Sequence, residues 1–254
     1  MLRDRLTVVI PHRRRADLLL GALAACEGWR VLVVDDTDDG LDLDVPRVRL
    51  GGGSGFAVAV NAGLAAVCTP SAVVLNDDAA PQGDCLERLA RQGGLCGPVL
   101  VGPSGVESAG LRVTGWGRVV QRTEVPNDDR VVDALSGACL HLPARLRFDE
   151  RFRHGGEDVE LCRRAGPAWL VAGARCWHEG GATVPRDSLE AQRHAVSGQL
   201  RLVDRPWKQA VVVGLNLAQV LREEVGCAPP RWAQARARLG AVRAGVGDVR
   251  AGAS

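Results

Sequence analysis

Short apolar runs alternate with amphipathic segments over the first hundred residues. Five runs are apolar and rich in β-branched residues, as buried strands are: residues 6–10, 31–34, 48–50, 71–75 and 97–101. Helical spacing of apolar positions fills three of the intervals between them: residues 16–26, 56–67 and 84–92. This alternation predicts an α/β fold in which helices cover both faces of a parallel sheet.

The pattern changes after residue 101. Residues 102–133 are rich in Gly, Pro and polar residues and show no clear period, which predicts short irregular or antiparallel strands. Later apolar runs predict strands at 134–140, 168–172 and 174–177, and a short helix is predicted at 157–165.

The end of the chain is predicted to be helical. Apolar positions at helical spacing cover about 189–203, 207–224 and 231–243, and we expect residues 244–254 to be frayed. No linker separates independent domains, so we expect one domain over residues 1–185 and a helical extension, 186–254, packed on it. These helices could contact a second copy of the chain or a membrane surface. No apolar run is long enough to predict a transmembrane segment.

The composition is that of an ordinary globular protein. Hydrophobic residues make up 46% and charged residues 24% of the chain, and the net charge of +2 gives no case for nucleic-acid binding. Eight cysteines form no C-x-x-C pair, which argues against a zinc ribbon or a thioredoxin-type site. They lie mostly in apolar runs, where cysteine behaves as a small buried hydrophobe. With no recognisable signal peptide, we expect a reducing, cytoplasmic location.

Two adjacent carboxylates, Asp77 and Asp78, follow the apolar run 71–75, with Asn76 before them. In open α/β sheets, ligands bind outside the carboxyl ends of the strands. Carboxylates at such an edge can hold a divalent cation through their oxygens. Asn and Asp are also favoured in solvated turns, and the segment alone does not separate these two interpretations.

A glycine-rich segment, residues 51–55, lies between a predicted strand and a predicted helix. The dinucleotide-binding fingerprint requires G-x-G-x-x-G after the first strand. Here the glycines follow the third strand, and Val58 stands where the third glycine would be. The pattern therefore argues against a Rossmann dinucleotide site. Small residues still allow a ligand to approach the backbone closely, although a flexible loop explains them equally well.

Several motifs occur in a fixed order along the chain. They are VVIPHR at 8–13, VVDDTDDG at 33–40, GFAVAVNAG at 55–63, LNDD at 75–78, SGA at 136–138, FDERF at 148–152 and EDVELCRR at 157–164. In this order they resemble the family-two glycosyltransferases with a GT-A fold, in the rhamnosyltransferase-like and galactofuranosyltransferase-like branch. The resemblance runs from about Thr7 to Thr183. The turn at 33–40 is one residue short, and Asn76 replaces the first acid of the DxD motif.

The resemblance implies a fold and a reaction. It implies a nucleotide-binding half at about 1–101 and an acceptor-binding half at about 102–185. The reaction would move a sugar from a nucleotide diphosphate sugar, of the UDP or dTDP type, to an acceptor hydroxyl with inversion, assisted by Mg²⁺ or Mn²⁺. The acceptor would be a cell-surface glycan or a secondary metabolite.

The resemblance also implies roles for individual residues. The nucleotide-sugar would be bound by Pro11, His12, Arg13, Asp35, Phe56, Asn61, Asn76 and Asp77. The metal would be bound by Asp78 and His178, and the acceptor or donor sugar would contact Ser136, Gly137 and Trp116. The general base would be Asp158, with Glu157 as the alternative, and the positive end of the helix would keep the carboxylate ionised.

Other interpretations of these residues and of the whole chain stay open. Glu157 and Asp158 could be first-turn acids that favour helix initiation, and His178 could be an ordinary half-buried histidine. A sugar-nucleotide nucleotidyltransferase is a second candidate, but its glycine-rich loop with a lysine after the first strand is missing. A non-catalytic nucleotide-binding or sugar-binding module is a third.

Overall fold

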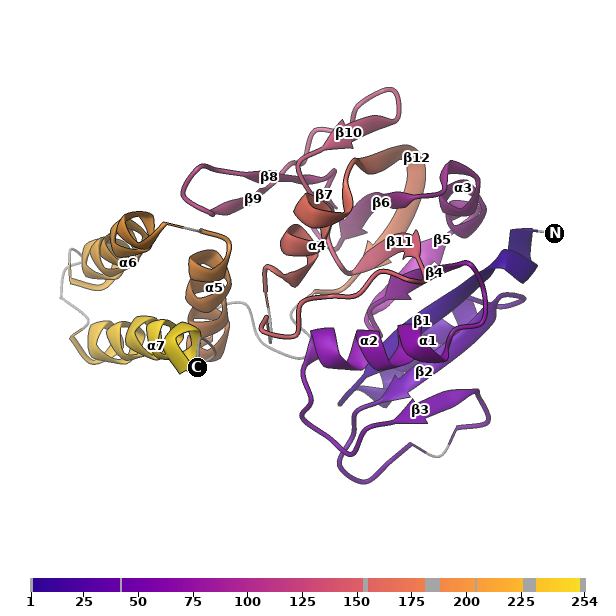
Figure 1. The fold of residues 1–254 in the computed structure, drawn as a ribbon, viewed down its shortest axis with the longest axis horizontal. Coiled ribbons are helices and arrows are strands. Elements are labelled where there is room, and N and C mark those ends of the chain that lie inside the picture. Colours follow the sequence, from indigo (N-terminus) through magenta and orange to yellow (C-terminus); the bar gives the residue numbers. More distant parts are fainter. Residues whose placement is uncertain are drawn as a thin grey trace.

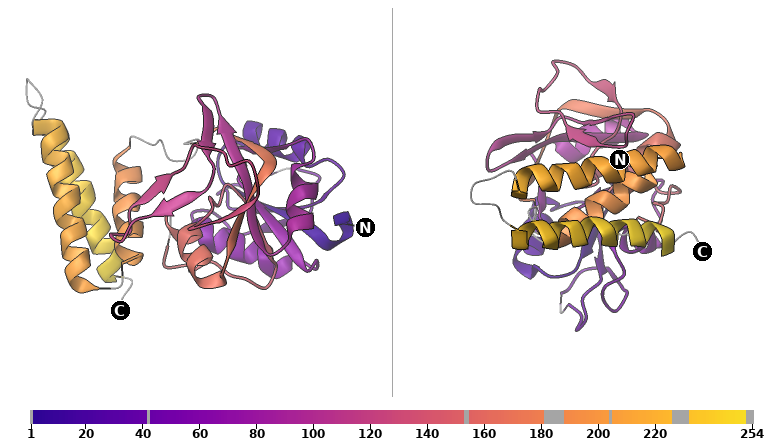
Figure 2. Two further views of the ribbon diagram at one scale, coloured as in Figure 1. Left: turned by 90° about the horizontal axis from the view of Figure 1, so that it is seen from above. Right: turned by 90° about the vertical axis from the view of Figure 1, so that its left-hand side faces the viewer.

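A ten-stranded sheet with helices on both faces forms the body of the molecule, and three further helices lie together at one end (Figures 1 and 2). The computed structural model describes residues 2–41, 43–152, 155–180, 188–203, 205–225 and 232–251. A short 3₁₀ turn, Leu2–Arg5, precedes the first strand. Within these ranges, no helix combines the length and the apolar character needed to cross a membrane.

Four strands form the parallel part of the sheet in the order β3-β2-β1-β4. They are β1 (Leu6–His12), β2 (Arg30–Asp35), β3 (Arg47–Arg49) and β4 (Ser71–Leu75). β1 lies between β2 and β4 and pairs with both in parallel. The four strands predicted from the early apolar runs are therefore confirmed, with small changes at their ends.

The sheet becomes mixed beyond β4. Strand β11 (Cys139–Pro143) runs antiparallel between β4 and β6 (Leu95–Gly102), so β4 and β6 are not neighbours. The mostly parallel sheet that is expected from the sequence is confirmed, with the antiparallel β11 inserted between β4 and β6. The strand predicted at 134–140 begins only at Cys139. Ala134, Leu135 and Ala138 precede the strand. Their side chains are buried in the core, which explains the apolar run.

Strand β12 (Ala168–His178) is one long strand that pairs in parallel with β6. Its pairing register shifts between Val171 and Arg175, at the position where two separate strands are predicted. The last residues of β12 pair with β5 (Ala79–Gln82), a short strand that the sequence pattern did not predict. The backbone N–H of Glu179 donates to the carbonyl of Asp78 at 3.0 Å. This pairing brings the end of β12 to the end of β4.

Short antiparallel strands occupy the segment without a clear period, as predicted. They are β7 (Gly105–Ser108), β8 (Leu111–Val113), β9 (Val119–Gln121) and β10 (Arg130–Val132). β8 and β9 form a hairpin apart from the main sheet, whereas β7 and β10 extend that sheet through β6 and β12.

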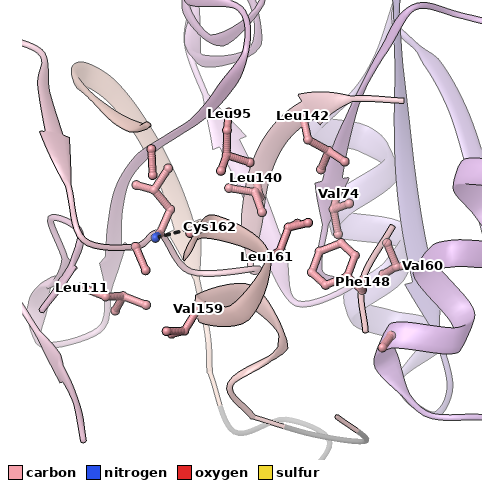
Figure 3. Close-up of a cluster of buried hydrophobic side chains, with 14 of the residues drawn as sticks. Val60, Val74, Leu95, Leu111, Leu140, Leu142, Phe148, Val159, Leu161 and Cys162 are labelled. Atoms are coloured by element: carbon pink, nitrogen blue, oxygen red, sulfur yellow. Dashed lines mark hydrogen bonds between the residues drawn. The ribbon is translucent and has the colours of Figure 1, made fainter. Parts of the chain in front are cut away.

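Two apolar cores cover the two faces of the sheet, because successive side chains of a strand point to opposite faces. Val8 and Ile10 of β1 pack with α1 (Ala16–Ala25) and α3 (Cys85–Gln92). Val9, between them, packs on the other face with α2 (Phe56–Ala66) and α4 (Glu157–Ala165). Figure 3 shows Leu161 of α4 beside Phe148 and the strand residues Val74 and Leu140.

Three C-terminal helices form a small core of their own. They are α5 (Leu189–Arg201), α6 (Pro206–Val220) and α7 (Trp232–Ala251), with a π-turn, Leu221–Val225, after α6. Val196, Val212 and Val242, one from each helix, are buried together. Helix α7 continues to Ala251, so the prediction that the chain frays from residue 244 is wrong over the described part.

Helix α5 attaches this extension to the body of the molecule. A side chain at Gly198 would place its Cβ 2.1 Å from the carbonyl oxygen of Gly155, so the helix and that loop are in direct backbone contact. Gln199 donates to the carbonyl of Trp116 at 3.0 Å, and Arg163 of α4 donates to the carbonyl of Leu202 at 3.0 Å. These contacts join the three C-terminal helices to the body of the molecule.

We expect Gly198→Ala to lower the free energy of unfolding by about 1–3 kcal/mol, because its methyl group meets backbone that cannot move aside freely. Gly214→Ala is the matched control, since it lies in helix α6 with nothing within 4 Å of an added Cβ. That change should raise stability by about 0.5–1 kcal/mol. Urea denaturation of both variants measures the difference. Equal stabilities for the two would show that the α5 contact is not tight.

Candidate active site

A cavity of about 300 Å³ opens at the carboxyl ends of the parallel strands, the edge at which ligands bind in open α/β sheets. β1, β4 and β12 end at this edge, and α2 and α4 begin there. Its wall combines backbone from these ends with polar side chains: Pro11, His12, Arg13, Asp36, Gly55, Phe56, Ala59, Asn76, Asp77, Asp78, Ser136, Gly137, Ala138, Glu157, Asp158 and His178.

One side of the cavity holds Asp78 and His178, which the sequence predicts as metal ligands. Nε2 of His178 lies 3.4 Å from Oδ1 of Asp78, and Nδ1 lies 2.8 Å from Oε2 of Glu107. Oδ1 of Asp78 is buried and has no hydrogen bond within the part of the chain that the structure describes. Glu107, on β7, orients the imidazole as carboxylates do beside metal-bound histidines. Sequence patterns gave no signal for it.

His178 and the carboxylates beside it, Asp78 and Glu107, favour each other's charged forms. Burial favours the neutral imidazole, yet the contacts with Asp78 and Glu107 outweigh it and raise the pKa of His178 to about 9. Burial also opposes ionisation of Asp78, but the neighbouring His178 holds the pKa of that carboxyl below its ordinary value. A cation bound between Asp78 and Nε2 would take the place of the Nε2 proton.

These two side chains fit a cation whose coordination is completed by other oxygens. Among the described residues, no group of three or more His, Cys, Asp or Glu side chains is arranged to hold a metal by itself. Mg²⁺ commonly takes only one or two carboxylates from the protein and shares its other positions with phosphates and water. The observation that fits this arrangement is the buried Oδ1 of Asp78, which accepts no hydrogen bond from a described residue and has only Nε2 of His178 beside it, at 3.4 Å.

The floor of the cavity contains a buried polar pair. Nδ1 of His12 lies 2.7 Å from Oδ2 of Asp77, and only 2% of His12 is exposed. Arg13 and Asn76 line the cavity beside this pair, and Phe56 packs edge-on against Phe148 at 5.8 Å between ring centroids. The structure thus brings together most of the residues predicted to bind the nucleotide-sugar.

Asp35 is an exception. Its carboxylate does not line the cavity and instead accepts hydrogen bonds from Thr37 and from the backbone N–H of Leu41, at 2.6 to 3.0 Å. Burial raises the pKa of Asp35, but these hydrogen bonds outweigh it and hold the pKa below the ordinary value. The predicted contact between Asp35 and the nucleotide is therefore corrected: the side chain organises the turn after β2.

The neighbouring residue lines the cavity instead. Asp36 accepts hydrogen bonds from the backbone N–H of Ser54 at 3.0 Å and from its hydroxyl at 2.8 Å. It therefore ties the turn after β2 to the glycine-rich segment. The two adjacent acids were visible in the sequence, but nothing in the pattern showed which one faces the cavity.

Asn61 is a second exception. Its amide donates to the carbonyl of Phe148 and to Glu150, both at 2.9 Å, and accepts from the N–H of Phe148 at 2.8 Å. It does not line the cavity. The prediction that Asn61 binds the nucleotide-sugar is corrected, because its hydrogen bonds hold the 148–150 segment against α2.

Glu157 and Asp158, at the start of α4, line the same cavity. Asp158 accepts hydrogen bonds from the backbone N–H of Gly137 at 3.0 Å and of Val159 at 2.8 Å. Oε2 of Glu157 is buried without a hydrogen bond from any described residue. Ser136 and Gly137, predicted to contact sugar, lie beside these acids on the wall.

Burial is the largest cause of the pKa shifts of Glu157 and Asp158. It raises the pKa of Glu157 to about 8, with a further rise from the charge of Asp158. Burial also raises the pKa of Asp158, although the N–H groups of Gly137 and Val159 oppose the rise. The expectation that the helix end alone keeps the carboxylate readily ionised is therefore corrected, because desolvation exceeds that effect here.

A second cavity, of about 930 Å³, meets the first at the acid pair. Ser136, Glu157 and Asp158 line both. The remaining wall comes from the β8–β9 hairpin and from the C-terminal helices. Trp116, predicted to contact a sugar, lies on this second cavity and packs edge-on against Trp207 at 5.9 Å.

Solved structures identify the fold that this geometry belongs to. The chain is similar to GalNAc-T7 crystallised with UDP, GalNAc and Mn²⁺, with a TM-score of 0.61 and 12% identity, over 93% of this chain and 54% of that one. It is also similar to TarS from S. aureus, with a TM-score of 0.54 and 14% identity, over 98% of this chain and 54% of that one. The chain thus spans about half the length of both.

A shorter form of the second neighbour gives the same result. TarS 1–349 in complex with UDP-GlcNAc has a TM-score of 0.56 and 13% identity, over 98% of this chain and 89% of that one. No protein-family model and no curated protein matches the sequence. The chain therefore has the GT-A fold, a mixed α/β sheet flanked by helices, with a C-terminal helical extension.

We expect Glu157→Gln to change how stability depends on pH. An acid whose pKa is higher in the folded state stabilises the fold at low pH, and this contribution is lost as pH rises from its ordinary pKa of 4.5 to about 8. The free energy of unfolding of the wild type relative to Glu157→Gln should therefore fall across that range.

Denaturation at several pH values measures this difference. Glu160→Gln is the matched control, because Glu160 lies on the same helix in an ion pair with Arg164 at the surface. A constant difference between wild type and Glu157→Gln from pH 5 to pH 8 would contradict the raised pKa.

Proposed function

We propose that the protein is a metal-dependent, inverting glycosyltransferase that moves a sugar from a nucleotide diphosphate sugar to an acceptor hydroxyl. The observation that carries this proposal is that Asp78 with His178 and Glu157 with Asp158, which lie far apart in the sequence, line one cavity. A cation-binding side and a proton-accepting side facing the same space are what such a transfer requires. The resemblance to the family-two branch supports the same conclusion.

The donor would bind in the first cavity. Pro11, His12, Arg13 and Phe56 would hold the nucleotide, and Asn76 and Asp77 would contact the ribose. Asp36 would contact the nucleotide in place of Asp35, because Asp36 lines the cavity. A UDP or dTDP donor is favoured, because the similar structures include complexes with UDP and with UDP-GlcNAc. The transferred sugar would be a hexose or a deoxyhexose.

Asp78 and His178 would hold Mg²⁺ or Mn²⁺ against the two phosphates of the donor. When bound, the cation would act as a Lewis acid that offsets the charge of the leaving diphosphate. Glu107 would fix the orientation of His178 through its contact with Nδ1. The crystal structure of GalNAc-T7 with Mn²⁺ supports divalent metal use on this fold.

Asp158 would act as general base at the junction of the two cavities. The acceptor oxygen would attack the anomeric carbon on the face opposite the diphosphate, Asp158 would take the hydroxyl proton, and the bond to the diphosphate would break. The N–H groups of Gly137 and Val159 hold the carboxylate in place for this step. Glu157 is the alternative base, because its raised pKa and unpartnered oxygen suit proton transfer near neutral pH.

We expect Asp158→Asn to lower the rate of transfer by at least about 10²-fold, because the amide cannot accept the proton. UDP affinity should stay within about twofold, because no nucleotide contact is lost. UDP release from a panel of UDP-sugars and acceptors measures the rate, and calorimetry measures the affinity. Glu160→Gln, on the exposed side of α4, is the control and should retain activity. Near wild-type turnover in Asp158→Asn, with loss in Glu157→Gln, would move the role of base to Glu157.

We expect Asp78→Ala to remove the effect of Mn²⁺ on UDP binding. Calorimetric titration of UDP with Mn²⁺ and with EDTA should give equal affinities for this variant and different affinities for the wild type. Asp84→Ala is the control, because Asp84 is exposed at the start of α3 and pairs only with Arg88 among the described residues. Unchanged Mn²⁺-linked affinity in Asp78→Ala would show that this carboxylate does not bind the cation.

A further inference from the structure

The second cavity is large enough for a sizeable ligand and is built from elements far apart in the sequence. At about 930 Å³ it falls in the range of small-molecule sites. The β8–β9 hairpin forms one side, the start of α4 forms the inner end, and α5, α6 and α7 form the rest. No step proposed above uses this space, although Asp158 opens onto it.

The acidic and basic residues on its wall come from different elements. Glu157 and Asp158 lie at the inner end, next to the first cavity. Every other charged residue on the described wall is an arginine: Arg118, Arg222 and Arg238. Arg222 and Arg238 come from the π-turn and α7, in the helical extension. The cavity therefore has acids where the base would act and guanidinium groups on other elements.

Arg222 is the group best placed to take a ligand. Its side chain is exposed, and its charge favours the ionised form of the neighbouring Glu223, although the ion pair of Glu223 is formed with Arg238. Arg238 beside it is held in position: Nη1 lies 2.9 Å from Oε2 of Glu223, and Nε donates to Gln192 at 3.3 Å. Guanidinium groups bind carboxylates and phosphates through paired, charge-assisted hydrogen bonds. Neither of these arginines lines the first cavity, so they are not placed to bind the donor.

The rest of the wall suits a polar molecule with a flat face. Amide side chains line it. Gln199 accepts a hydrogen bond from the amide of Asn216 at 3.2 Å and donates one to the carbonyl of Trp116 at 3.0 Å. The ring of Trp116 is 40% exposed. At the inner end, the buried and unpartnered Oε2 of Glu157 can accept a hydrogen bond from a hydroxyl.

We propose that the second cavity binds an acceptor with a hydroxyl group at one end and an anionic group, a phosphate or a carboxylate, at the other. The hydroxyl reaches Asp158 and Glu157, and Arg222 with Arg118 and Arg238 binds the anion. The proposal rests on the proposed function for its hydroxyl end, since that end is defined by the base. The anionic end rests on the arginines alone.

Calorimetry with glucose 6-phosphate as the probe tests the proposal, with UDP and Mn²⁺ present so that the first cavity is filled. We expect glucose 6-phosphate to bind and methyl glucoside to bind at least about tenfold more weakly, because only the former can pair with a guanidinium group. Arg222→Gln should weaken glucose 6-phosphate binding by about tenfold. Arg236→Gln is the matched control, because Arg236 is an exposed arginine of α7 that does not line the cavity.

Equal binding of glucose 6-phosphate to wild type and Arg222→Gln overturns the proposal, as does equal binding of methyl glucoside and glucose 6-phosphate. Inorganic phosphate that binds as tightly as glucose 6-phosphate also overturns it, since the site would then recognise the anion alone. Failure of the proposed function gives a different result: the wild type would not bind UDP with Mn²⁺, while Arg222-dependent binding of glucose 6-phosphate could still be measured without them.

Discussion

The pairing of β11 with β4 determines where the acids of the candidate active site lie. Cys139 pairs with Leu75, and the N–H of Asn76 donates to the carbonyl of Ala138 at 2.9 Å. Gly137, one residue before, donates its N–H to Asp158 at 3.0 Å. A short path of backbone contacts thus connects the end of β4, which carries Asp78, with the start of α4. A shift of β11 by one residue would turn its buried side chains to the wrong face, so the hydrophobic core fixes the distance between the two acid sites.

The pKa values of carboxyl groups in this one cavity are shifted in opposite directions. Asp78 lies next to an imidazole, and its pKa is lowered despite burial. Glu157 is more deeply buried and lies next to another carboxyl, and both effects raise its pKa to about 8. Environments that shift the pKa values of two carboxyl groups in opposite directions suit the two groups to different roles. The lowered pKa favours the ionised form of Asp78, whereas the pKa of about 8 allows Glu157 to hold a proton near neutral pH. Burying so many titratable groups without full hydrogen bonding lowers stability, which is common where a site is built for a ligand.

Local patterns in the sequence predicted the parallel strands and the helices, because burial and helical spacing leave a periodic pattern, whereas most residues of the cavity wall were predicted only from the resemblance to known motifs. They did not predict side-chain direction. Asp35 and Asn61 occupy the expected positions in their motifs, yet their hydrogen bonds go to the turn after β2 and to Phe148, which lies 87 residues away from Asn61. The start of β11 was also missed, because Ala134, Leu135 and Ala138 are buried apolar residues that precede the strand. Glu107 could not be found, since its partner His178 lies in a distant strand.

The helical extension contacts the loop that precedes the acid pair, Glu157 and Asp158. Gly198 of α5 contacts the backbone of Gly155, which lies two residues before Glu157. Gly156, between them, has a φ of 94°, a left-handed conformation that glycine adopts without strain, and it begins α4. Displacement of α5 would therefore disturb the loop that sets the position of Glu157 and Asp158. Because the same helices also form a large part of the wall of the second cavity, the shape of that cavity and the placement of the acids both depend on this packing contact.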